Sequence, residues 1–215
     1  MSPEALLVSA TGICKGFRRK AVLEGAALEA RAGEAVALVG ENGAGKTTLL
    51  RICAGLIPAD SGEVRVRGPI GYCPQDPGVF ELLTAEEHLV LFGRALGLPR
   101  KEALAQGRAL LDGFGFPLEE RGAARDLSAG TKQKLNLALA LLGDPKVLLL
   151  DEPYQGFDRG TYVDFWDHVQ GWRQDARAVV IVTHMLAELD RVDRIIELPL
   201  LPSLQVTGAA ARGPR

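Results

Sequence analysis

The sequence lacks an excess of either charge, a set of paired cysteines and a cluster of metal ligands. Its 25 lysines and arginines nearly balance 27 aspartates and glutamates, and the net charge of −2 gives no electrostatic case for binding nucleic acid. Cys14, Cys53 and Cys73 are odd in number and never spaced as C-x-x-C, which argues against a disulfide framework or a zinc site. His88 and His168 have no partners at ligand spacing, so we interpret them as surface or packing residues.

Long hydrophobic runs are also missing. The longest apolar segments, residues 137–142 and 147–150, are far shorter than the roughly 20 residues that cross a bilayer. The first residues carry Glu4 and lack the basic and then hydrophobic stretches of a signal peptide. We therefore expect a cytoplasmic protein that reaches a membrane only through a partner.

Short runs rich in β-branched residues alternate with longer helical patterns, which is typical of βαβ units and a mostly parallel sheet. Two earlier segments, residues 6–15 and 22–30, are punctuated by glycines and predict a separate antiparallel layer. Buried strands of the parallel sheet are expected at residues 36–39, 70–73, 147–150 and 179–182.

The middle of the chain has a different character. Helical patterns occur there, such as residues 85–96 and 101–113, and no convincing strand does. We interpret it as an α-helical subdomain inserted into an α/β core. The predicted organisation is one domain over residues 1–198, with its core in 1–77 and 145–198, the helical subdomain in 78–144, and a flexible tail in 199–215.

The segment GENGAGKT, residues 40–47, matches the pattern G-x-x-x-x-G-K-[ST] and lies between an apolar strand and a helical pattern. Such a turn points backbone N–H groups at phosphates, and the following helix presents its positive end. Lys46 is expected to reach the β- and γ-phosphates, and the Thr47 hydroxyl to ligate Mg²⁺. The residues predicted to hold the nucleotide here are Gly40, Asn42, Gly43, Ala44, Gly45, Lys46, Thr47 and Thr48.

Two adjacent acids end the hydrophobic run VLLLDE, residues 147–152. A strand beside a phosphate-binding loop delivers its last residue to the nucleotide crevice, so Asp151 is expected to hold Mg²⁺ directly or through water. Glu152, one residue on, is placed to act as the general base that polarises an attacking water.

The loop and the two acids together resemble the nucleotide-binding subunit of ATP-binding cassette (ABC) transporters, over about residues 6–198. LSAGT, residues 127–131, is similar to the family signature LSGGQ, and Ser128 stands in an N-cap position before a helical pattern. Ala129 and Thr131 depart from the signature, whereas Ser128 and Gly130 are kept. The resemblance implies that Ser128 and Gly130 contact the γ-phosphate of ATP bound to a second copy.

Four more residues match family motifs. Gln75 resembles the glutamine that senses the γ-phosphate and Mg²⁺, and His184 resembles the histidine that contacts the γ-phosphate. Asp158 is similar to the aspartate that reaches the partner's site. Phe17 stands where the family places an aromatic ring on adenine, although a phenylalanine in this apolar neighbourhood fits a core role equally well.

The resemblance implies a RecA-like P-loop NTPase core that hydrolyses ATP with Mg²⁺. It also implies a homodimer or heterodimer of ATPase subunits, bound to an integral membrane permease subunit on the cytoplasmic face. Residues 78–98 are loosely similar to ATPase subunits of export systems, and no regulatory domain follows residue 198, which favours export. The alternative is a soluble ABC-type ATPase, such as one that assembles Fe–S clusters. A P-loop GTPase is disfavoured because no N-K-x-D segment occurs.

Overall fold

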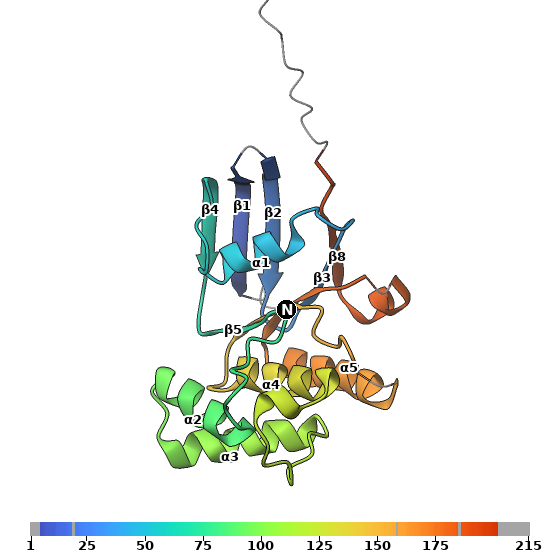
Figure 1. Ribbon diagram of the computed structural model, residues 1–215. Coiled ribbons are helices and arrows are strands. Elements are labelled where there is room, and N and C mark those ends of the chain that lie inside the picture. Colours follow the sequence, from blue (N-terminus) through green and yellow to red (C-terminus); the bar gives the residue numbers. More distant parts are fainter. Residues whose placement is uncertain (1–4, 19, 158, 185, 202–215) are drawn as a thin grey trace, which may run out of the picture.

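The computed structural model describes residues 5–201 apart from 19, 158 and 185. Its larger sheet has five parallel strands in the order β5-β6-β7-β3-β8. Four of them confirm the predicted buried strands. Figure 1 labels β5, β3 and β8 of this sheet. The five strands are β3 (Ala35–Val39), β5 (Ile70–Cys73), β6 (Val147–Asp151), β7 (Ala178–Val182) and β8 (Arg194–Glu197).

A second sheet is antiparallel, with the strand order β2-β1-β4. It is formed by β1 (Leu6–Phe17), β2 (Lys20–Arg31) and β4 (Ser61–Val66). The predicted antiparallel layer is therefore confirmed, although β1 and β2 are longer than expected. The sequence analysis missed β4 and β8. Both are exposed at most positions, so neither carries the apolar run by which a buried strand is recognised.

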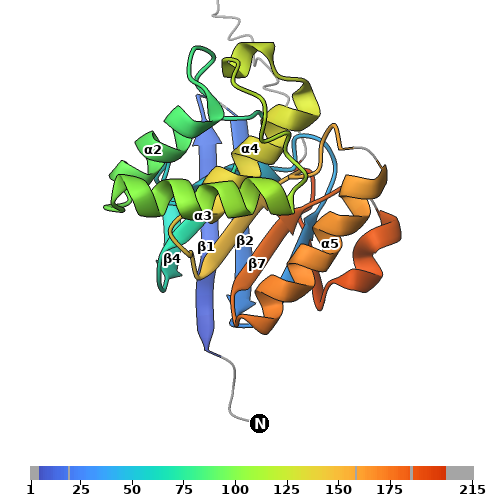
Figure 2. The same ribbon diagram turned by 90° about the horizontal axis from the view of Figure 1, so that it is seen from below.

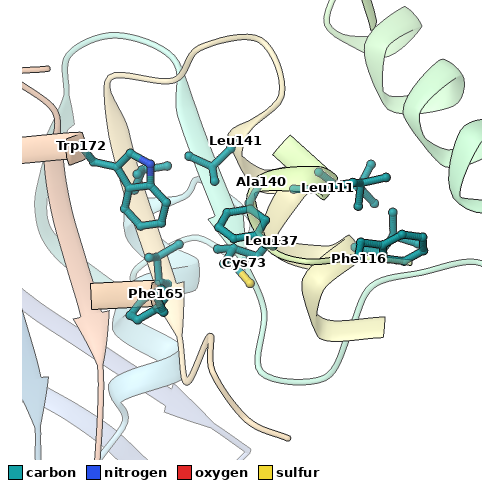
Figure 3. Packing of buried hydrophobic residues seen from close by; sticks show 14 of the residues in the cluster. Cys73, Leu111, Phe116, Leu137, Ala140, Leu141, Phe165 and Trp172 are labelled. Carbon is teal, nitrogen blue, oxygen red and sulfur yellow. The ribbon is translucent and has the colours of Figure 1, made fainter. Parts of the chain in front are cut away.

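The parallel sheet separates two hydrophobic clusters. Side chains alternate along β6: Val147 and Leu149 join the cluster shared with the antiparallel sheet, whereas Leu148 and Leu150 join the cluster shared with the large helices. The first cluster also takes in the buried face of α1 (Lys46–Cys53). Figure 3 shows the second cluster, where Phe165 and Trp172 lie close to Leu137 and Cys73.

The remaining helices lie on the other side of the parallel sheet from the antiparallel strands (Figures 1 and 2). They are α2 (Ala85–Ala95), α3 (Arg100–Gly113), α4 (Ala129–Leu141) and α5 (Arg159–Gln174), with short 3₁₀ turns at Ala124–Asp126 and Leu186–Arg191. The helices predicted at 85–96 and 101–113 are confirmed to within a residue. Among the described residues no helix is long and apolar enough to span a bilayer.

His88 is a packing residue, fully buried in the first half of α2. The Phe80 N–H donates to its Nε2 at 2.7 Å, so the proton of the neutral ring is on Nδ1, which lies 2.7 Å from the Thr84 carbonyl oxygen. Thr84 is also the N-cap of α2 and forms a capping box with Glu87. His88 therefore ties the loop before α2 to its first turn.

Replacing His88 with Gln supplies an amide that matches both hydrogen bonds but does not titrate. Burial lowers the pKa of His88, so the unfolded chain takes up a proton more readily than the folded protein, and stability is lost as the pH falls below about 6.5. We expect the free energy of unfolding, from urea titrations at about pH 7.5 and about pH 5.5, to fall more for the wild type than for H88Q. Equal falls in the two proteins would contradict this assignment.

Candidate functional site

A cavity of about 350 Å³ opens at the carboxyl ends of β3, β6 and β7. Parallel strands commonly deliver their ligand-binding loops to this edge of a sheet. Ten of the predicted site residues line it, together with Lys20, Val22 and Val182, which the sequence analysis did not single out. The predicted ones are Phe17, Asn42, Gly43, Gly45, Lys46, Thr47, Thr48, Gln75, Glu152 and His184.

The loop between β3 and α1 has backbone angles that favour glycine. Gly43 and Gly45 have φ values of 88° and 92°, and a Cβ on Gly45 would lie 2.6 Å from Leu23 Cδ2 and 2.9 Å from the Val22 carbonyl oxygen. Gly45 is also the N-cap of α1 and makes no side-chain capping bond. The first turn of α1 therefore offers its N–H groups to a ligand, which is the arrangement that binds phosphate.

Lys46 is held across this loop. Its Nζ donates to the Gly40 carbonyl oxygen at 2.7 Å and to the Glu41 carbonyl oxygen at 3.0 Å. Burial lowers the pKa of Lys46, while the nearby charges of Glu152 and Asp151 act to raise it. The ammonium is thus held in place within the loop, next to the start of α1.

Asp151 is fully buried at the end of β6, and neither carboxylate oxygen has a hydrogen-bond partner among the described residues. Burial raises its pKa, opposed by the nearby Thr47 hydroxyl, whose position falls short of a hydrogen bond. A buried carboxylate without a partner suits a cation. No group of three His, Cys, Asp or Glu residues forms a metal site in the described part of the chain, so Mg²⁺ would complete its shell with phosphate and water oxygens, as it commonly does.

Glu152 and His184 face each other across the site, with Glu152 Oε1 2.8 Å from His184 Nε2. Glu152 has a φ of 48°, which is uncommon for a residue other than glycine, and its N–H donates to the Val182 carbonyl oxygen at 3.2 Å. Such strained residues cluster at functional sites because the surrounding structure must hold them in place. The two loops that follow β6 and β7 are therefore joined at this acid and histidine.

A second contact between these loops was not foreseen from the sequence. The hydroxyl of Tyr154 is hydrogen-bonded to that of Thr183, directly before His184. The ring of Tyr154 packs edge-on against Tyr162 and Phe165, at centroid distances of 5.0 and 5.6 Å. In the sequence Tyr154 stands out only as one of several aromatic residues, since its hydroxyl partner is 29 residues away along the chain.

Phe17 ends β1 at the rim of the cavity and is 48% exposed, with Lys15 Nζ 5.5 Å from its ring centre. The reading of Phe17 as a core residue is therefore wrong. The role of its ring in stacking on adenine stays a prediction.

Ser128 and Gly130 do not line the cavity of their own chain. Ser128 caps α4, since its Oγ accepts from the Thr131 N–H at 3.1 Å. The Thr131 hydroxyl, one of the two departures from the signature, lies 2.8 Å from the same Oγ. A Cβ on Gly130 would come within 2.4 Å of the Gly156 carbonyl oxygen, so α4 begins against the loop after β6. Asp158 lies outside the described residues.

The fold and the phosphate-binding loop define a P-loop NTPase. The family model described as "ABC transporter" matches residues 23–155, and the chain belongs to this family as an ATP-binding cassette.

Among curated proteins, the chain is 32% identical over 207 residues to the human phospholipid-transporting ATPase ABCA3, covering 91% of this chain and 12% of that protein. It is 37% identical over 172 residues to the human retinal-specific phospholipid-transporting ATPase ABCA4, covering 74% of this chain and 8% of that one. The chain thus spans a small part of the length of these relatives.

Among solved structures, an ATP-binding subunit of an ABC transporter aligns with a TM-score of 0.81 at 28% identity, covering 92% of this chain and 89% of that one. A bacterial ABC transporter cassette described as dimeric aligns with a TM-score of 0.83 at 24% identity, covering 90% and 94%, and shares the fold.

Replacing Asp151 with Asn tests the unpaired carboxylate. Because its pKa is raised by burial, the charged form opposes folding at every pH above the ordinary value for aspartate, and a neutral amide removes that penalty. Without nucleotide or Mg²⁺ at neutral pH, we expect D151N to raise the free energy of unfolding by about 1–3 kcal/mol. In contrast, Mg²⁺ with ATP should stabilise D151N less than the wild type.

Urea titrations with and without Mg²⁺ and ATP measure both effects. The control is Asp167→Asn on the exposed face of α5, which should shift the free energy of unfolding by no more than about 0.5 kcal/mol. If D151N has a lower free energy of unfolding than the wild type in the absence of ligands, the buried carboxylate does not destabilise the fold.

Proposed function

We propose that this chain binds ATP with Mg²⁺, hydrolyses it, and thereby energises a membrane transporter. The observation that carries the proposal is the single cavity lined by the phosphate-binding loop, Gln75, and the Glu152–His184 pair, with the buried carboxylate of Asp151 beside it. These groups supply, in one place, phosphate binding, cation binding and a base for water. A purely structural role would not require such an arrangement.

The residues divide the chemistry as follows. The N–H groups at the start of α1 and the Lys46 ammonium bind the β- and γ-phosphates and stabilise the charge that develops on them. Asp151 and the Thr47 hydroxyl hold Mg²⁺, with Gln75 near the γ-phosphate. Mg²⁺, when bound there, would neutralise part of the phosphate charge. Phe17 provides a surface on which the adenine ring stacks.

Glu152 acts as the general base. Its carboxylate accepts a proton from the water that attacks the γ-phosphorus, and the bond to the β-phosphate oxygen breaks to give ADP and phosphate. His184, 2.8 Å from this carboxylate, orients it and contacts the γ-phosphate. The loops carrying both residues are further joined by the hydroxyls of Tyr154 and Thr183.

We propose that two copies, or this chain and a related cassette, pack head to tail around the nucleotides. Ser128 and Gly130 stand outside their own chain's cavity at the capped start of α4, which is another helix N-terminus suited to phosphate. In the dimer they would contact the γ-phosphate bound to the partner. ATP then favours the closed pair, and its hydrolysis allows the pair to open.

A membrane partner would dock on the helical subdomain. A second cavity, of about 750 Å³, lies along α2 and is bordered by apolar side chains such as Val90 and Leu91 and by charged ones including Arg94, Arg100 and Glu86. Leu82 and Phe80, in the loop that connects Gln75 to α2, are 74% and 53% exposed. Leu91 lines this cavity and is 45% exposed, and Leu82 directly precedes Leu83, which also lines it. Exposed apolar side chains beside a hollow are typical of a protein interface. We propose that the permease inserts a short cytoplasmic helix here.

Export is the direction we propose. Residues 78–98 resemble ATPase subunits of export systems. Two relatives are named as phospholipid-transporting ATPases, which favours an amphipathic cargo for the assembled transporter. The alternative is a soluble ABC-type ATPase such as one that assembles Fe–S clusters. Purification of the chain from native membranes in detergent separates the two: a stoichiometric polytopic membrane protein supports transport, and recovery of soluble proteins alone supports the alternative.

Replacing Glu152 with Gln should slow ATP hydrolysis by about 10²- to 10⁴-fold, because the amide cannot accept the water proton. The affinity for ATP should remain close to that of the wild type, since Glu152 does not hold the phosphates. Steady-state phosphate release and equilibrium titration with a fluorescent ATP analogue measure the two quantities. Lys46→Ala is the contrasting variant, and it should weaken binding itself. Hydrolysis by E152Q within a few-fold of the wild type would assign the base to another group.

Replacing Leu91 with Glu should abolish co-purification of the permease while leaving ATP affinity unchanged, because Leu91 is 45% exposed beside the second cavity and distant in sequence from the phosphate-binding loop. Leu56→Glu is the matched control, since Leu56 is 59% exposed and does not line that cavity. Equal recovery of the permease with both variants would place the docking surface elsewhere.

A further inference from the structure

A buried amide cluster lies behind the loop that carries Gln75. Gln133 and Asn136, on consecutive turns of α4, are 1% and 4% exposed, and Cys73 at the end of β5 is fully buried beside them. Cys73 also belongs to the hydrophobic cluster of Figure 3. Two amide side chains in such surroundings are costly unless their polar atoms are paired. Their hydrogen bonds therefore show what they hold.

Asn136 is hydrogen-bonded to the loop on both sides of Gln75. Its Nδ2 donates to the Pro74 carbonyl oxygen at 2.9 Å, and its Oδ1 accepts from the Gly78 N–H at 3.4 Å. Pro74 directly precedes Gln75, and Gly78 follows it by three residues. One side chain thus pairs a backbone carbonyl and a backbone N–H in the loop that follows β5.

The orientation of the Asn136 amide is itself fixed. Nδ2 lies 3.2 Å from Gln133 Oε1 and 3.2 Å from Cys73 Sγ, in addition to its bond to Pro74. Gln133 Nε2 lies 3.8 Å from the same sulfur. With acceptors on the Nδ2 side and a donor on the Oδ1 side, the reversed amide would place like groups together. Asn136 is therefore held in one conformation.

Helix α4 connects Asn136 to Ser128, which is proposed to contact the ATP bound to a partner. Asn136 lies eight residues after Ser128, about 12 Å along α4 at the rise of an α-helix. α4 is one continuous helix from Ala129 to Leu141, and its side chains are buried without a break from Leu135 onward. Its regular backbone hydrogen bonds make the Ser128 end and Asn136 parts of one element. A shift of the Ser128 end would therefore act on Pro74 and Gly78 through the hydrogen bonds of Asn136.

We propose that Asn136 is a positioning residue that couples the placement of Gln75 to the orientation of α4 and hence of Ser128 and Gly130. This inference rests on the proposed function, in which Gln75 serves the cation and γ-phosphate of one nucleotide and Ser128 serves the other. The remaining buried face of α4 is leucine and alanine, and a leucine at position 136 would fill similar space without touching the loop. Asn136 is polar because of the loop that it holds.

The test is Asn136→Leu, with Leu137→Val as the matched control that alters a buried neighbour in the same helix and leaves the amide in place. Hydrogen exchange followed by mass spectrometry on the full chain should show faster exchange of the Gly78 N–H, which Asn136 holds, and of the neighbouring Gln75 and Asp76 N–H groups in N136L but not in L137V. The amides of α4 should remain protected in both. This readout does not depend on catalysis.

Kinetics supply the second measurement. N136L should lower kcat for ATP hydrolysis by about ten-fold and raise the Mg²⁺ concentration at half-maximal rate, with KM for ATP within about two-fold of the wild type. Wild-type exchange at residues 75–78 in N136L would overturn the inference, as would an equal loss of kcat in L137V. Failure of the wild-type chain to hydrolyse ATP would instead count against the proposed function, and the exchange result would stand apart from it.

Discussion

Burial of the central strands of the parallel sheet on both faces is the constraint on which the rest of the structure depends. Every residue of β6 and β7 is buried, and successive side chains point into opposite hydrophobic clusters. Strands buried on both faces carry apolar side chains until they end, because a polar side chain there would be buried without a partner. The polar groups of the site therefore appear where β6 and β7 stop, at Asp151, Glu152 and His184, and they share one edge because the strands are parallel.

The site brings together charged groups that do not fully neutralise one another. On one side, Lys46 and the uncapped start of α1 present positive charge, and on the other Asp151 presents a buried carboxylate with unpaired oxygens. Their mutual attraction is incomplete, since burial still shifts the pKa of each toward the neutral form. In the proposed function, the phosphates would pair with Lys46 and the start of α1, and Mg²⁺ would pair with Asp151. Burial of these charges lowers the stability of the fold, and binding of the proposed nucleotide and Mg²⁺ would offset that loss.

Much of the fold was predictable from the sequence because β-branched runs and the phosphate-loop pattern are local signals. β3, β5 and α2 lie within a residue or so of their predicted bounds. β4 and β8 were missed because pairing with neighbouring strands, rather than an apolar pattern of their own, makes them strands. Within the site, loop residues with a motif were anticipated. Lys20 reaches the cavity because it pairs with Phe17 across β1 and β2, and no local pattern specifies that register.

Contacts between distant segments escaped prediction for the same reason, and they are the ones that set geometry. Tyr154 meets Thr183 across 29 residues, and Asn136 meets Pro74 across 62. Each joins a loop that follows a buried strand to an element outside that strand. Because the strands themselves are fixed by two hydrophobic clusters, their loops are the parts of the site with freedom to move. The hydrogen bonds of Tyr154 and Asn136 restrain these loops, so the geometry of the site depends on side chains that do not line the cavity.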